Sequence, residues 1–280
     1  MKARFGSVVP LCLFVAGFGL SASPAALAQN QSSQVTGPSA YLYLTNEIEK
    51  PGMSAAHAKN EHAAAEAMRQ ANAPFHYFAL RDITGPSHVM FLHGFDSFAD
   101  LAKSHMAMVS NATLEATLAS NDATDGTFLT GKTNSIYKYR KDLSLNPGVD
   151  FPQMRLFEIT LYHVRAGHGQ DFESLAKVFA KAYESMPNER WAVFEKMYGV
   201  GSDNIFILAT PMKSANEIDK EQLDSKKLPA SIGKAQMQMM QELYNRTVKS
   251  SESDLFAISP QMSYEPASWA TASPDFWGKK

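Results

Sequence analysis

The chain contains one order of elements twice, and this internal repeat constrains its fold more than any single segment does. Each half predicts a strand, a helix, two further strands, more helix and a closing strand. The best-matched stretches are FDSFADLAK at 95–103 and MKSANEIDK at 212–220. Because a repeated unit must bury a face that its partner covers, we expect the two halves to pack on each other.

Apolar alternation, helical spacing of apolar residues and turn residues assign these elements to residue ranges. The first half predicts strands at 41–49, 75–82, 87–93 and 135–139, a helix at 53–72, and a helix from 96 or 97 to about 108 that continues less regularly to 118. The second half predicts strands at 155–164, 191–198, 205–208 and 254–259, a helix that follows Gly167, and helices at 214–220 and about 230–248.

A β-α-β-β-α-β unit forms a four-stranded antiparallel sheet with both helices on one face, which leaves the other face bare. Two such units cover each other by closing their bare faces into a barrel. We therefore predict an α+β fold in which two tandem ferredoxin-like units pair within the chain into one α+β barrel. The predicted boundaries are 40–144 for the first unit, 145–154 for a linker, 155–262 for the second unit and 263–280 for a C-terminal tail, whose aromatic residues indicate docking on the body.

The N-terminus has the pattern of a secretory signal peptide at 1–28. Lys2 and Arg4 precede an apolar run at 8–20, and Ala26-Leu27-Ala28 offers a cleavage site. Because the run is short for a bilayer span, we expect cleavage at this site and a disordered linker at 29–39. The prediction is an exported protein, in the bacterial periplasm or outside the cell, with no membrane attachment after cleavage.

The mature chain that this cleavage predicts lacks the residues for several kinds of chemistry. Cys12, the one cysteine, lies in the signal, so disulfides, thiolate zinc sites and cysteine nucleophiles are excluded. Without Lys2 and Arg4, 24 of the 26 basic residues remain against 28 acidic ones, which gives a net charge of −4. The sequence has no basic stripe, so nucleic acid is not an expected partner. A homo-oligomer stays open.

One local motif connects the chain with a known superfamily. The stretch VRAGHGQDF at 164–172 ends a strand in a glycine turn that opens an amphipathic helix, and EKPGM at 49–53 is a weaker version. With these motifs the chain resembles the dimeric α+β barrel superfamily, over most of residues 40–262. That superfamily includes stress-responsive barrel proteins, NIPSNAP-like proteins, antibiotic-biosynthesis-type monooxygenases, haem-degrading monooxygenases and chlorite-dismutase-like haem proteins. The resemblance implies the fold, and it implies a tandem member whose halves pair within the chain.

Alternation along the first strand of each half predicts where a ligand lies. With Gly52 aligned to Gly167, one set is apolar and is expected to face the helices: Leu42, Leu44, Phe157 and Ile159. The opposite set is polar and is expected to face the barrel interior: Tyr43, Thr45 and Glu47, with Glu158, Thr160 and Tyr162. We predict a cavity between the sheets that holds a small, largely apolar molecule oriented by Tyr43, Thr45, Thr160 and Tyr162. The alternative is a filled barrel in which these groups bond to one another.

Two glutamates of the polar set are candidates for acid–base chemistry. Glu158 lies in mid-strand, where burial in an apolar barrel would raise its pKa and suit it to act as a general base. It is the predicted catalytic residue of a monooxygenase- or isomerase-type enzyme. For Glu47, exposure at the strand end is the expectation.

Histidines offer metal and haem ligation. His57 with Glu61, and His62 with Glu66, are spaced i, i+4 on a helix, but the spacing misses the zinc-peptidase motif by one residue. The helix is alanine-rich and is expected to face solvent there, so no metal site is predicted.

Haem is the alternative to a cofactor-free protein. Three histidines lie on the first hairpin, at 76, 88 and 93. The resemblance to chlorite-dismutase-like proteins implies a haem ligand from the second half, where His163 and His168 lie at the strand end and the helix start. No cofactor is therefore predicted. Three functions stay open: a binding protein, an enzyme of the monooxygenase or isomerase type, and an assembly module with a filled barrel.

Overall fold

Within the described residues of the computed structural model, which are 36–186, 188–201 and 204–278, eight strands close into one barrel. The first half contributes β1 (Tyr41–Glu49), β2 (Tyr77–Asp82), β3 (His88–Phe95) and β4 (Leu129–Tyr139), and the second half contributes β5 (Leu156–Val164), β6 (Ala192–Tyr198), β7 (Asn204–Met212) and β8 (Val248–Tyr264). The order around the barrel is β1-β3-β2-β8-β5-β7-β6-β4. The predicted α+β class is confirmed, and the predicted signal peptide lies outside the described residues.

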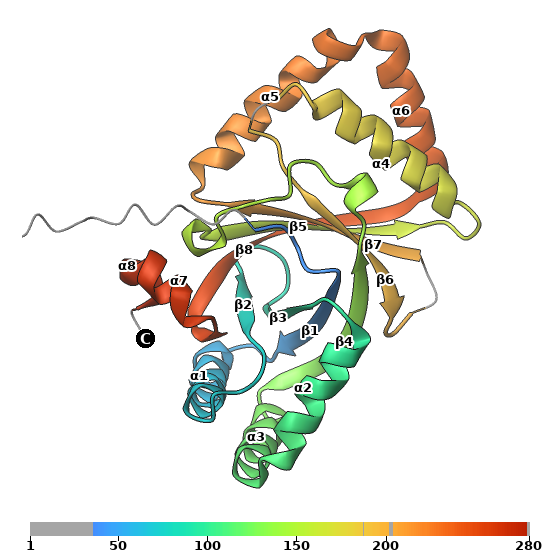
Figure 1. Ribbon diagram of the computed structural model, residues 1–280. Coiled ribbons are helices and arrows are strands. Elements are labelled where there is room, and N and C mark those ends of the chain that lie inside the picture. The colour runs from blue at the N-terminus through green and yellow to red at the C-terminus, as the bar shows by residue number, and fades with distance from the viewer. Residues whose placement is uncertain (1–35, 187, 202–203, 279–280) are drawn as a thin grey trace, which may run out of the picture. The chain divides into compact units, whose positions relative to one another are not determined.

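Antiparallel pairing of β2 with β8 and of β4 with β6 joins the halves and leaves no free sheet edge. Helices α1 (Ser54–Gln70), α2 (Phe98–Ser110) and α3 (Ala112–Asp125) lie beside the first-half strands, and α4 (Gly169–Tyr183), α5 (Asn216–Ile232) and α6 (Lys234–Thr247) lie on the opposite side of the barrel (Figure 1). None of these or the other described helices is long and apolar enough to cross a membrane.

Local sequence explains how the helices begin. Gly52 and Gly167 have φ of 81° and 82°, a left-handed conformation that glycine adopts without strain, and each precedes the first helix of its half. Ser97 accepts a hydrogen bond from the Asp100 amide at the start of α2, and Asn111 accepts one from the Leu114 amide at the start of α3. Both are N-caps of the ordinary kind.

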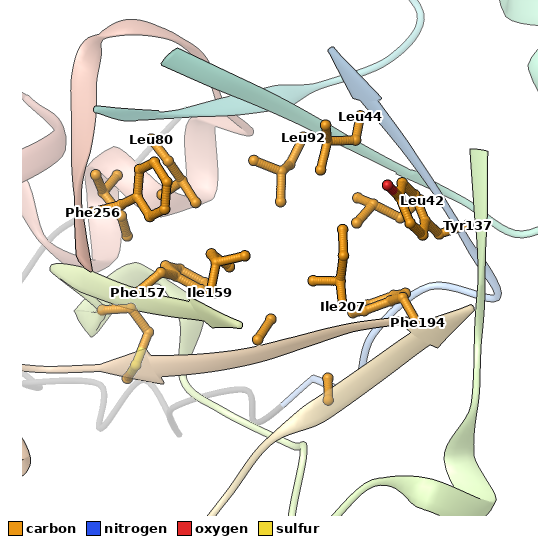
Figure 2. Packing of buried hydrophobic residues seen from close by; sticks show 14 of the residues in the cluster. Leu42, Leu44, Leu80, Leu92, Tyr137, Phe157, Ile159, Phe194, Ile207 and Phe256 are labelled. Carbon is orange, nitrogen blue, oxygen red and sulfur yellow. The ribbon is translucent and has the colours of Figure 1, made fainter. Parts of the chain in front are cut away.

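The barrel interior is apolar (Figure 2). Leu42 and Leu44 of β1 and Phe157 and Ile159 of β5 point into it, together with one residue from each of the six other strands: Leu80, Leu92, Tyr137, Phe194, Ile207 and Phe256. The prediction that the four β1 and β5 residues face the helices is therefore wrong. Both faces of each strand are covered, one by the barrel interior and the other by helices. Alternation therefore separates the two sets of side chains but does not show which set faces the barrel and which faces the helices.

The barrel is not completely filled. Its apolar side chains enclose a cavity of about 340 Å³ that extends to Ser39, Pro147 and Trp269 at one end. A cavity therefore lies inside the barrel, where the sequence predicted one. Most of the side chains that surround it are hydrocarbon, and Thr36, Ser39 and His76 are among the polar ones.

The C-terminal segment packs on the linker between the halves. Two short helices, α7 (Ala267–Ala272) and α8 (Pro274–Trp277), lie against the 3₁₀ turn at Phe151–Gln153. Trp277 is fully buried and donates from Nε1 to the Pro152 carbonyl at 2.9 Å. The rings of Trp269 and Phe151 stack with centroids 4.5 Å apart, and the Arg155 guanidinium lies 4.0 Å from the Phe276 ring centroid.

This packing predicts a large stability effect at Trp277. Trp277→Ala should lower the free energy of unfolding by about 3–5 kcal/mol, because it removes a buried ring and leaves a cavity. Val200→Ala, at a side chain that is 76% exposed, should change it by less than about 0.5 kcal/mol. Urea unfolding followed by tryptophan fluorescence measures both, and similar midpoints for the two variants would contradict the prediction.

Candidate functional site

A cavity of about 540 Å³ lies in the first half, between the outer face of the sheet and helices α1, α2 and α3. We call it the first-half pocket. Its apolar wall includes Ala64, Met68, Phe75, Phe91, Met108 and Leu118. Its polar end includes Glu47, Glu61, Asp125 and Lys132, and Tyr43 lines the wall beside His93.

Strand β1 directs every second side chain into this pocket. Tyr43, Thr45 and Glu47 line it, while Leu42 and Leu44 between them face the barrel. Across the sheet, Tyr43 pairs with His93 on β3 and Glu47 pairs with Lys132 on β4. The register of three strands thus places these polar groups on one outer face.

Helix α1 forms the opposite wall. His57, Glu61, Ala64 and Met68 recur at helical spacing, which places them on one face of the helix. The prediction that this part of the helix faces solvent is wrong, because the His57 side chain is 0% exposed. The many alanines of this helix led to the expectation of a solvent-exposed surface. The buried face of the helix nevertheless carries charged side chains.

The polar end is built around His57. Its Nδ1 donates to Oε1 of Glu49 at 2.7 Å, and its Nε2 donates to Oε2 of Glu47 at 2.9 Å. Burial acts to lower the pKa of His57, but the two hydrogen bonds outweigh it and raise the pKa to about 9. The ring is therefore an imidazolium at neutral pH, held between two carboxylates.

Both of these carboxylates have further donors. Lys132 Nζ lies 2.8 Å from Oε1 of Glu47, and the Ser54 and Ser87 hydroxyls donate to Oε2 of Glu49, the second at 2.7 Å. Burial favours the protonated acids, yet these donors together with His57 lower the pKa of both glutamates. The expectation that Glu47 is exposed is wrong, since it is 2% exposed.

Two more carboxyl groups approach the same point without such donors. Asp125, at the end of α3, is 2% exposed and neither carboxylate oxygen accepts a hydrogen bond, although Oδ1 lies 3.3 Å from His57 Nε2. Burial, and then the negative charge of Glu47, raises the pKa of Asp125 to about 6 and that of Glu61 to about 8. One ligand atom from each of Glu47, His57, Glu61 and Asp125 lies within 4.8 Å of every other, so this set could hold a metal ion.

The far end of the pocket is aromatic. The His93 ring stacks on Phe75 with centroids 4.4 Å apart, and Tyr77 meets Phe91 edge-on at 5.8 Å. Burial, with a smaller contribution from His76, lowers the pKa of His93 to about 4. The imidazole is therefore neutral and offers a hydrogen-bonding nitrogen in an apolar wall.

A second cavity, of about 230 Å³, lies in the second half between the sheet and helices α4, α5 and α6. We call it the second-half pocket. Tyr162 lines it, with its ring 5.4 Å from Phe172, and so do Glu189 and Glu221. Burial raises the pKa of Glu158, and burial with the charges of Glu158 and Glu189 raises that of Glu221 to about 7.

The prediction that the polar residues of β1 and β5 share the barrel interior is wrong. They lie on the outer faces, Tyr43 and Thr45 in the first half and Glu158, Thr160 and Tyr162 in the second. The Thr45 hydroxyl donates to Oδ1 of Asn134 at 2.8 Å, and the Thr160 and Ser253 hydroxyls are 2.7 Å apart, so both threonines have structural partners. The role of Glu158 as a base stays a prediction.

The second half does not fit the haem pattern that the resemblance implies. Neither His163 nor His168 lines the second-half pocket, and His168 Nδ1 lies 2.9 Å from Asp171 Oδ2 on the partly exposed end of α4. On the first hairpin, His88 bonds to the Pro86 carbonyl at 2.5 Å and packs against Phe256, while the His76 ring packs on Tyr264.

Comparison with known proteins adds information on the fold. No family model and no curated protein matches the sequence. Among solved structures, an anthrone oxidase-like protein is 12% identical over 80% of this chain and 94% of its own, with a TM-score of 0.51. A candidate monooxygenase of Fusobacterium nucleatum is 8% identical over 78% and 91%, with a TM-score of 0.50. A mutant chlorite dismutase of Candidatus Nitrospira defluvii is 9% identical over 81% and 95%, with a TM-score of 0.47.

The chain shares its fold with the anthrone oxidase-like protein and the candidate monooxygenase. At such low identity the likeness extends to the fold alone. Residue roles have to be argued from the pockets themselves.

The neutral state of His93 predicts an acid-dependent loss of stability. An unfolded histidine has a pKa near 6.5 and the folded one about 4, so the unfolded chain binds more protons between these values. The contribution of His93 to the free energy of unfolding should therefore fall by up to about 2 kcal/mol between pH 6.5 and about pH 5. Glu61 and Asp125, whose pKa values are raised, contribute in the opposite direction in the same window, so the expected result is that His93→Gln gains stability relative to the wild type as the pH falls. His105→Gln, at an exposed position, should keep the wild-type slope. Urea unfolding at several pH values measures this, and equal slopes in all three proteins would contradict it.

Proposed function

We propose that the protein binds a small, largely apolar molecule with one polar end in the first-half pocket. The observation that carries this proposal is the shape of the pocket, in which a largely hydrocarbon wall faces the charged groups around Glu47 and Lys132. Its volume of about 540 Å³ lies in the range of about 300–1,000 Å³ that is typical of small-molecule sites. The proposal keeps the ligand class predicted from the sequence and moves it from the barrel interior to the helix-covered face.

The pocket's two ends assign an orientation to the ligand. Rings or hydrocarbon lie between Phe75, Phe91 and Met68, where burial of apolar surface supplies the binding energy. Hydroxyl or carbonyl groups lie toward Lys132 or beside the Tyr43 phenol. Burial raises the pKa of the Tyr43 phenol, against the opposing charge of Lys132, so the phenol stays protonated and can donate a hydrogen bond.

Turnover of the bound molecule, by an enzyme of the monooxygenase or isomerase type, is the second part of the proposal. It is supported by the fold that the chain shares with an anthrone oxidase-like protein and a candidate monooxygenase. An anthrone is a polycyclic, largely apolar ketone, so it has the chemical pattern that the pocket presents. Export, the tandem arrangement of two ferredoxin-like units and the absence of a cofactor remain predictions from the sequence.

The barrel interior is a second candidate for the binding site. Its cavity of about 340 Å³ is lined by Leu42, Leu92, Ile159 and other hydrocarbon side chains. It suits a molecule without polar groups, whereas the first-half pocket suits one with a polar end.

An alanine lines each of the three cavities, so the same change, from alanine to leucine, can be made in each cavity in turn. Ala64→Leu should weaken binding of anthrone or a dihydroxyanthrone at least about 10-fold, because it fills the first-half pocket. Ala176→Leu in the second-half pocket and Ala209→Leu in the barrel should leave the affinity within about 3-fold. Titration followed by tryptophan fluorescence, with circular dichroism to confirm folding, measures the three affinities. If only Ala209→Leu weakens binding, the ligand lies in the barrel instead.

A second pair of variants assigns any turnover to one half. Tyr43→Phe should lower kcat/KM about 10-fold through the loss of one hydrogen bond to the substrate. Glu158→Gln should leave kcat/KM unchanged, because Glu158 lies on the outer face of the other half. Oxygen uptake and product formation with the same anthrones provide the measurement. Loss of turnover in Glu158→Gln alone would move the reaction to the second half, where Glu158 is the predicted base.

A further inference from the structure

The strongest unexplained feature of the molecule is the set of acidic side chains around His57. Glu47 comes from β1, His57 and Glu61 come from successive turns of α1, and Asp125 ends α3. Their nearest ligand atoms all lie within 4.8 Å of one another. Two consecutive elements, β1 and α1, and the distant α3 therefore converge on one point, at the polar end of the first-half pocket.

We propose that Glu47, His57, Glu61 and Asp125 bind one divalent metal ion. The chemistry of the set fits a cation of intermediate hardness, because one imidazole and three carboxylates suit Mn²⁺, Fe²⁺ or Zn²⁺. The site is distinct from a haem site, and its metal binding does not depend on the proposed apolar ligand.

The environment of Asp125 is the observation that favours a bound cation. Its carboxylate is buried, and neither oxygen accepts a hydrogen bond of ordinary geometry. The neighbouring Asn60 amide acts to lower the pKa of Asp125, but it donates to the Asn121 carbonyl at 3.0 Å. The nearest cationic group is His57, whose Nε2–H is directed to Glu47 at 2.9 Å and lies farther, at 3.3 Å, from Asp125. A bare buried carboxylate is costly, so an ion that binds it directly would account for its position.

Glu49 prepares His57 to be a ligand. It accepts the proton of Nδ1 at 2.7 Å and is itself bonded by the Ser54 and Ser87 hydroxyls. This fixes the ring and leaves Nε2 directed at the other three groups. A carboxylate on the outer nitrogen of a metal-binding histidine is the usual arrangement that orients the ring and raises its basicity.

The local charges also favour a divalent ion. Three ligand carboxylates and one dication leave a single negative charge, and Lys132 lies 2.8 Å from Glu47 and 2.9 Å from Asp122. The Glu49 carboxylate on His57 Nδ1 adds one further negative charge to the surroundings of the ion. Loading the ion would displace the proton on His57 Nε2 and any protons held by Glu61 and Asp125.

The second half shows that the fold itself does not need these charges. When the halves are aligned at Gly52 and Gly167, the positions of Glu47, Glu49 and His57 correspond to Tyr162, Val164 and Phe172. There the buried ring of Phe172 packs on Tyr162 with centroids 5.4 Å apart, and Val164 is buried. Since apolar residues can fill such positions without loss of stability, the ionic set in the first half has a role beyond packing.

Three of the four groups, Glu47, Glu61 and Asp125, also line the first-half pocket. A bound ion therefore borders the cavity. A molecule oriented with a hydroxyl or carbonyl toward this end would meet the ion, which can polarise such an oxygen as a Lewis acid.

Metal content of the purified protein tests the proposal with the ion alone. After removal of bound metal and dialysis against Mn²⁺ or Zn²⁺, the wild type should retain about one ion per chain and its thermal midpoint should rise. Asp125→Asn and Glu61→Gln should each weaken metal binding at least as much as the ~10–100-fold typical of outer-shell variants. Glu66→Gln, on the exposed side of the same helix, is the matched control and should bind like the wild type. Elemental analysis, calorimetry and Mn²⁺ electron paramagnetic resonance give the readouts.

Two outcomes would overturn the proposal. In one, the wild type retains no ion, metal leaves its midpoint unchanged, and Asp125→Asn is more stable because it removes a bare buried charge. In the other, Glu66→Gln loses as much metal as Asp125→Asn, which would show nonspecific binding to the surface. Failure of anthrone binding with metal binding intact would instead affect only the proposed function.

Discussion

Closure of the sheet is the constraint on which the rest of the structure depends. Once β2 pairs with β8 and β4 pairs with β6, every strand has two neighbours and no edge needs protection. The inner face then meets only other inner faces, and hydrocarbon is the side-chain chemistry that fills such a space without partners. Polar chemistry is left to the outer faces, where helices can supply donors and charges of their own.

The position of the candidate site follows from this division. The outer face of the sheet is covered by helices, and the side chains of a helix do not follow the alternation of the strand. A charged side chain on a strand can therefore pair with an oppositely charged side chain on a helix. Glu47 on β1 and His57 on α1 do this at 2.9 Å. The inner faces lack this freedom, because an ion pair there would lose its hydration with no third layer to supply hydrogen bonds.

The sequence predicted the elements better than it predicted their environment. Strand β1 has the predicted bounds, and the helix predicted at 53–72 is α1 at Ser54–Gln70. β8 starts at Val248 instead of 254, because its first seven residues, VKSSESD, are mostly exposed and carry no apolar alternation. They join the sheet through backbone pairing with β5, which side-chain patterns do not record.

For the candidate site, the sequence identified the right residues on β1 and gave them the wrong environment. Alternation grouped Tyr43, Thr45 and Glu47 correctly, yet both faces of the strand are covered, and period two alone does not distinguish a barrel from a helix layer. The spacing of His57 and Glu61 was also visible, although the third and fourth groups that make it meaningful, Glu47 and Asp125, come from elsewhere in the chain. Convergence of this kind is a property of the tertiary fold.

The two halves differ in the side chains that lie between the sheet and its first helix. In the second half, aromatic and aliphatic side chains occupy the positions equivalent to His57, Glu47 and Glu49, and the pocket there has a volume of about 230 Å³ against about 540 Å³ in the first half. Both halves complete the same barrel, so the barrel itself does not select between these solutions. A chain that buries an imidazolium and four carboxyl groups where packing would serve has accepted a desolvation cost of several kcal/mol per ion. Hydrogen bonds within the cluster offset that cost for His57, Glu47 and Glu49, whose charged forms are favoured despite burial. Burial raises the pKa of Glu61 and Asp125 instead, and these are the two groups that the proposed metal ion would stabilise as carboxylates.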